Sequence, residues 1–173
     1  MNCKKFNFRY LTVLFLIFCF SCSSLSNINN FQCERHIPRD FIPILVFLEP
    51  FNQEWEKNVI EACNQWGSDK VVYGGMSLEL TSIIPPNTSG IVPIIIENYG
   101  NESYTFNGID NKDGCTIKWS YITIPYNWDI KFRTKTIAHE LGHVFGYVHT
   151  NDPNSVMYPF AITDRYNFNN LRK

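Results

Sequence analysis

Three of the four histidines of this 173-residue chain lie within one run of eleven residues, from His139 to His149. The run reads His-Glu-Leu-Gly-His-Val-Phe-Gly-Tyr-Val-His. Positions four apart on an α-helix lie one turn apart on the same face, so His139 and His143 would project side by side. Two imidazoles placed in this way can bind one zinc ion at about 2.0–2.1 Å each. The spacing therefore predicts a helix that carries two ligands of a metal site.

The second half of the run predicts the third ligand and an open coordination position. Gly146 suits a sharp turn with positive φ at the end of the helix, and this turn would bring His149 back to the metal. Three protein ligands leave the fourth position for water, which is the arrangement of catalytic zinc sites. Glu140 directly follows the first ligand and would lie beside the metal. The alternative is a helix with scattered histidines, but the longer pattern is far more specific than HExxH alone.

A second motif follows the run, since residues 155–159 read Ser-Val-Met-Tyr-Pro. Together the two motifs resemble the metzincin metallopeptidases and, within them, the matrixins, whose Met-turn is similar. Astacins and serralysins have a zinc-binding tyrosine two residues after the methionine, where this chain has Pro159. Residues 62–66, Ala-Cys-Asn-Gln-Trp, are similar to the Ala-xxx-Trp pattern on the first helix of matrixin catalytic domains.

The resemblance implies a zinc-dependent endopeptidase with one catalytic Zn²⁺. Glu140 would be the general base that takes a proton from water and returns it to the leaving amine. Met157 would form an apolar floor under the imidazoles, and an extended peptide would add to the edge of a sheet. The zinc ligands would be His139, His143 and His149, and the wall of the substrate pocket would be formed by Tyr158, Pro159 and Phe160.

Hydrophobic periodicity predicts an α+β fold, and the resemblance implies the same one. One twisted mixed β-sheet would pack on two long helices, with the zinc cleft along the sheet edge and a short C-terminal helix. Pro93 argues against a central strand position at its own residue. The expected strands are 41–48, 70–73, 77–80, 91–97 and a run from 117 to Pro125; the first helix extends from an N-cap at Asn52 to Gly67, and the last helix covers 162–171.

Residues 98–115 are rich in Asn, Asp and Gly, and we expect a polar loop with turns there. Matrixins carry calcium in comparable loops, so Ca²⁺ is a second candidate ion, although no full EF-hand spacing is present.

The N-terminus predicts an extracytoplasmic address. Residues 1–21 have a basic start and an apolar stretch too short to span a bilayer well, as in a secretory signal peptide. The end of this segment resembles a bacterial lipoprotein signal, with Cys22 as the lipid-carrying residue. Residues 22–40 would be a tether or short lead segment, and 41–173 the catalytic domain. The protein would be lipid-anchored in the bacterial cell envelope; plain secretion and an uncleaved anchor are the alternatives.

Composition and charge limit the classes of partner that we expect for the protein. The net charge is −1, and no basic run follows the signal, so we expect no nucleic-acid partner. We expect a monomer that acts on a protein or peptide substrate. Outside the cytoplasm one disulfide among Cys33, Cys63 and Cys115 is plausible, and three pairings are open. Cys33 or Asp40 is also a candidate inhibitory ligand of the zinc.

Two other functions compete with the endopeptidase. A non-catalytic envelope binding module on a metallopeptidase scaffold would be expected to have lost the glutamate or a ligand, and neither is lost. An exopeptidase would need charged groups that hold a substrate terminus, and the sequence identifies none. The natural substrate and the cleavage preference do not follow from the sequence.

Overall fold

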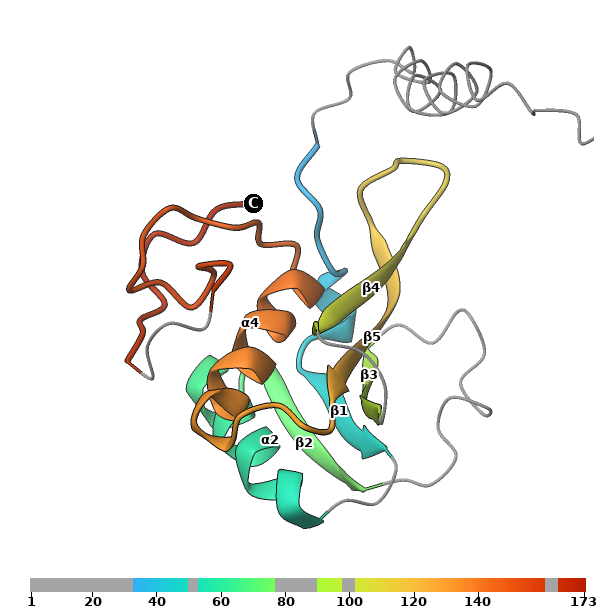
Figure 1. Cartoon of the computed structure of the whole chain (residues 1–173). Coiled ribbons are helices and arrows are strands. Elements are labelled where there is room, and N and C mark those ends of the chain that lie inside the picture. The colour runs from blue at the N-terminus through green and yellow to red at the C-terminus, as the bar shows by residue number, and fades with distance from the viewer. Residues whose placement is uncertain (1–32, 50–52, 77–89, 98–101, 161–164) are drawn as a thin grey trace, which may run out of the picture. The chain divides into compact units, whose positions relative to one another are not determined.

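A computed structural model describes residues 33–49, 53–76, 90–97, 102–160 and 165–173 (Figure 1). The predicted signal peptide, Cys22, the N-cap at Asn52 and the strand 77–80 lie outside the described residues. Within those ranges, no helix has the length and apolarity that a bilayer crossing requires.

The core of the fold is a mixed five-stranded sheet in the order β2-β1-β3-β5-β4. Strands β2, β1, β3 and β5 run parallel to one another, and β4 runs antiparallel to β5 at one end of the sheet. This arrangement confirms the predicted mixed sheet and leaves β4 as an edge strand. The strands are β1 (Ile44–Glu49), β2 (Val71–Met76), β3 (Ile91–Glu97), β4 (Tyr104–Ile109) and β5 (Ile117–Pro125).

The proline in β3 does not prevent this strand from being the middle one. Pro93 pairs with Phe47 of β1, and the register with β5 begins one residue later, at Ile94. The residue that lacks an N–H therefore precedes the second ladder.

Two long helices, α2 (Gln53–Trp66) and α4 (Arg133–Val144), contact each other and lie on the same side of the sheet (Figure 1). Helix α2 buries one stripe of side chains at helical spacing, as predicted. Trp66 at its end also donates an indole hydrogen bond of 2.9 Å to the carbonyl of Ala138 in α4. The buried stripe consists of Trp55, Val59, Ala62, Cys63 and Trp66.

The predicted start of the first strand was wrong. The first strand begins at Ile44 rather than at 41, because Phe41 closes the short 3-10 helix η1 (Arg39–Phe41) and Pro43 follows it. A second short 3-10 helix, η2 (Ile130–Phe132), leads into α4.

The polar segment 98–115 is only partly a loop, because it contains strand β4. Tyr104 and Phe106 are exposed, whereas Thr105 between them is half-buried on the opposite face. The predicted Asx turns do form beyond β4: Asp113 accepts backbone hydrogen bonds from Cys115 and Thr116, while Asp110 pairs with Lys118 at 3.0 Å. A calcium ion at this loop remains a prediction.

The predicted C-terminal helix is absent from residues 165–171, the described part of that range. The chain instead pairs with the segment before it: Asn167 accepts a hydrogen bond from the N–H of Val156 and donates one to the carbonyl of Asn154. Phe168 packs edge-on against Trp66, with 4.8 Å between the ring centroids. Long-range backbone pairing and aromatic burial therefore replace the local helix.

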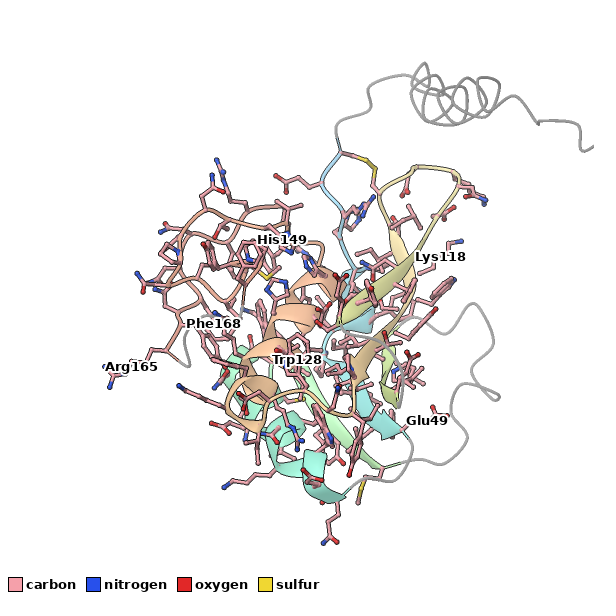
Figure 2. The ribbon with its side chains drawn as sticks, in the orientation of Figure 1. Glu49, Lys118, Trp128, His149, Arg165 and Phe168 are labelled. Carbon is pink, nitrogen blue, oxygen red and sulfur yellow. A yellow bond between two sulfur atoms is a disulfide. The ribbon has the colours of Figure 1, made fainter. Side chains whose placement is uncertain are left out.

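A disulfide joins Cys33 to Cys115 in the β4–β5 hairpin (Figure 2). It selects one of the three possible pairings and leaves Cys63 buried as a free thiol, whose pKa burial raises to about 12.

The compact unit begins at Cys33, so residues 33–40 of the expected lead segment belong to this unit. Because the sulfur of Cys33 is bonded to Cys115, it is not available as an inhibitory zinc ligand in this form; Asp40 as such a ligand remains a prediction.

Candidate metal centre

Three histidine side chains meet at the C-terminal end of α4 (Figure 2, where His149 is labelled). His139 and His143 lie one turn apart on α4, as their spacing predicted. Gly146 has a φ of +86°, and the turn that it makes returns the chain so that His149 faces the helix. An added Cβ at this glycine would lie 2.2 Å from the carbonyl oxygen of Arg35. The position therefore needs both the positive φ and the missing side chain.

The three Nε2 atoms form a nearly equilateral triangle. They are separated by 3.2 Å between His139 and His149, 3.2 Å between His139 and His143, and 3.1 Å between His143 and His149. Tetrahedral ligands at zinc–nitrogen distances of about 2.0–2.1 Å lie about 3.3–3.4 Å apart. The triangle thus has the size that a single zinc ion requires.

The opposite ring nitrogens fix which atom is free to bind a metal. Nδ1 of His139 lies 2.8 Å from the carbonyl of Val156, and Nδ1 of His143 lies 2.8 Å from the carbonyl of Tyr147. A carbonyl can only accept, so each Nδ1 carries the proton and each Nε2 presents its lone pair. Burial lowers the pKa of His139 to about 4 and also lowers that of His149. Neutral imidazoles are the form that coordinates metals, so the donor set fits zinc.

The segment after the third histidine packs against the helix that carries the first two. Met157 is fully buried, and an added Cβ on Gly142 would lie 2.2 Å from its sulfur. A helix-interior glycine costs roughly 1 kcal/mol relative to alanine, and here the absent side chain makes room for Met157. The N–H of Tyr158 donates to the carbonyl of Ser155 and closes the turn that carries Met157.

Glu140 is buried and held by residues that sequence reasoning missed. Its side chain points toward the start of β4: Ser103 Oγ, just before the strand, donates to Oε1 at 2.7 Å, and Thr105 Oγ1 within it lies 2.6 Å from Oε2. The signal that would have found this strand is the alternation of polar and aromatic residues over 103–107, Ser-Tyr-Thr-Phe-Asn.

Strand β4 also contacts the second histidine. Asn107 Nδ2 donates a hydrogen bond of 2.9 Å to the backbone carbonyl of His143. The other end of this amide accepts from Ser120 Oγ on β5, at 2.6 Å. The amide therefore ties the C-terminal turn of α4 to two strands of the sheet.

The predicted pocket wall lies at the surface. Tyr158 is half-buried, Pro159 is exposed, and the Phe160 side chain is 62% exposed. The rings of Tyr158 and Phe160 are 5.7 Å apart, centroid to centroid. Buried Lys135 of α4 reaches the carbonyl of Phe160 at 3.3 Å, which connects this segment to the helix. Their role toward a substrate remains a prediction.

The family model of the matrixin peptidases matches residues 126–173. The matched segment contains the three histidines, Glu140 and Met157, but neither α2 nor any strand of the five-stranded sheet. No curated protein matches the chain. The matrixin match supports a zinc metallopeptidase family and implies zinc binding, and the histidine cluster could hold the metal ion.

Proposed function

We propose that this chain is a zinc-dependent endopeptidase. The observation that carries the proposal is the triangle of Nε2 atoms from His139, His143 and His149, 3.1–3.2 Å apart, with a carboxylate on the same helix. The matrixin match over the same segment supports it. His149 is exposed and the other two histidines are half-buried, so solvent and substrate have access to the metal position.

A bound zinc ion would supply a Lewis acid that polarises a peptide carbonyl and lowers the pKa of water to about 7. The residues of the chain perform the proton transfer. Glu140 takes the proton of the attacking water on a carboxylate oxygen and then gives it to the leaving nitrogen. The Nδ1 hydrogen bonds of His139 and His143 to backbone carbonyls hold both rings in orientation through these steps.

Substrate binding would use the free edge of β4. This strand ends the sheet, so its outer backbone groups face away from β5. An extended peptide can add there as a further strand through main-chain hydrogen bonds. A strand-like binding mode holds the chain on both sides of the cleaved bond, which favours endopeptidase over exopeptidase action. Tyr158, Pro159 and Phe160 would then form the wall of the pocket for the side chain after that bond.

The proposal also includes the cellular location of the protein. A disulfide between Cys33 and Cys115 is typical of proteins that fold in an oxidising compartment. This pairing supports an envelope or secreted location, with Cys22 as the site of a lipid anchor in the first case. Labelling with a fatty-acid analogue that fails on Cys22→Ser protein would test the anchor.

The decisive experiment measures hydrolysis of an unfolded protein by the zinc-loaded chain. We expect turnover that stops when a chelator removes zinc and returns when zinc is added. Glu140→Ala should keep zinc and lose about 10²- to 10⁴-fold in kcat, the usual contribution of a general base. Glu34→Ala, at an exposed position outside the site, is the matched control. Zinc-loaded wild-type protein that binds peptides without cleaving them would favour the non-catalytic binding module instead.

A further inference from the structure

Three polar side chains in β4 and immediately before it face the metal-binding helix. Side chains two apart on a strand point to the same face. Ser103, immediately before β4, and Thr105 and Asn107 within it are half-buried, while Tyr104 and Phe106 between them are exposed. All three polar side chains reach α4: two contact Glu140 and one contacts the carbonyl of His143.

Glu140 depends on this strand for the position of its carboxylate. The residue is only 3% exposed, and a buried carboxylate is costly unless donors satisfy its oxygens. Oε1 accepts from Ser103 Oγ at 2.7 Å, and Oε2 lies 2.6 Å from Thr105 Oγ1, which is also 2.9 Å from the backbone carbonyl of Glu140. The two hydroxyls therefore contact both ends of the carboxylate and the backbone that carries it.

We infer that Ser103 and Thr105 are positioning residues that orient the carboxylate of Glu140 for proton transfer. The inference rests on the proposed peptidase function and identifies residues outside the matrixin-matched segment. Each carboxylate oxygen has two lone pairs, so the oxygens that accept these hydroxyls can still accept a hydrogen bond from water. The two hydroxyls of Ser103 and Thr105, called the clamp below, therefore fix the orientation of the Glu140 carboxylate and leave its oxygens able to accept a proton.

The same strand connects the base to the substrate. If the peptide lies along the outer edge of β4, the hydroxyls fix the carboxylate relative to the strand that holds the cleaved bond. A misplacement of about 1 Å can cost roughly 10²-fold in rate. Loss of the clamp should thus reduce kcat and leave KM almost unchanged, because the backbone edge that binds the peptide is retained.

Hydroxyl removal tests the clamp. We expect zinc-loaded Thr105→Val and Ser103→Ala each to lose roughly 10- to 100-fold in kcat, with KM changed by less than about threefold. Thr105→Ser keeps the hydroxyl and should recover most of the rate. Thr116→Val is the matched control, since it removes a hydroxyl that donates to Asp113 in the β4–β5 hairpin, away from the site.

A thermal cycle gives a readout that does not depend on turnover. We expect Thr105→Val to lower Tm by about 3–8 °C in the wild-type background and by clearly less in Glu140→Ala, because the carboxylate partner of the hydroxyl is then absent and only the backbone carbonyl of residue 140 remains. Equal losses in both backgrounds would overturn the clamp. So would a Thr105→Val or Ser103→Ala variant with the kcat of wild type, or a Thr105→Ser variant as slow as the valine variant. Ser103→Ala keeps the test available if Thr105→Val does not fold.

Failure of the clamp and failure of the peptidase proposal give different results. An active wild-type enzyme whose rate is insensitive to both hydroxyls contradicts the clamp alone. A zinc-loaded wild type that does not cleave any peptide of a random library contradicts both.

Discussion

Helix α4 and strand β4 supply polar groups to the same site, but they are encoded in different ways. The ligands on α4 are four residues apart and belong to the segment matched by the matrixin family model. The hydrogen bonds from β4 join residues 35 to 37 positions apart, and β4 lies outside that segment. The three histidines thus come from a local pattern in the chain, whereas the hydrogen-bond partners of the Glu140 carboxylate come from a distant part of the sequence, at and just before an edge strand.

The physical reason is the period of each element. A helix repeats every 3.6 residues, so two ligands on one face leave a short and specific pattern. A strand repeats every two residues, and its alternation of Ser103, Tyr104 and Thr105 looks like that of any half-buried strand. Only their contacts with Glu140 on α4 distinguish these hydroxyls from those of other half-buried strands.

The largest effect should come from a ligand on the α4 side. His143→Ala removes one of the three candidate nitrogen ligands; for scale, zinc binding in zinc-finger peptides is worth about 10–16 kcal/mol. A third of that free energy, about 3–5 kcal/mol, predicts a loss of at least roughly 100-fold in zinc affinity, measured by competition with a chromogenic chelator. His36→Ala removes the fourth histidine and should bind zinc as wild type does. If the zinc affinity of His143→Ala equals that of wild type, α4 does not supply the metal ligands and the contrast between α4 and β4 fails.

An intermediate effect is expected at the turn after α4. Gly146→Ala combines a left-handed φ with an overlap against the Arg35 carbonyl, so we expect a loss of about 2–4 kcal/mol in the free energy of unfolding. Gly114 in the β4–β5 hairpin also has positive φ, at +68°, but open space around it. Gly114→Ala should therefore lose only about 1–2 kcal/mol. Denaturant titration of both variants separates the cost of the positive φ, which both share, from the cost of the overlap with the Arg35 carbonyl, which only Gly146→Ala has. Equal losses of unfolding free energy would show that the overlap is relieved without cost.

The smallest effect should come from the β4 side. Asn107→Ala removes the hydrogen bond to the carbonyl of His143 from a half-buried position, which predicts a loss of about 1 kcal/mol in unfolding free energy. Asn111→Ala, at an exposed position of the same hairpin, should change stability by less than about 0.5 kcal/mol. If the two variants unfold at the same denaturant concentration, β4 does not support α4 through this amide.

Much of the framework was predictable because its signals are local. The buried stripe of α2, the apolar runs of β1 and β3, and the turn at Gly146 all follow from periodicity or from the conformational freedom of glycine. Strand β4 was missed because its Asn, Asp and Gly neighbours resemble a loop. The terminal helix was wrong because residues 165–171 exchange local hydrogen bonds for pairing with the segment around Met157.

The sequence by itself determined the histidine cluster and the two helices, since both depend on spacings of a few residues. Tertiary structure decided which cysteine stays free, where the tail runs, and which hydroxyls hold Glu140. Each of these depends on groups that are far apart in the chain, and a periodicity of 2 or 3.6 residues carries no information about which distant segments will meet.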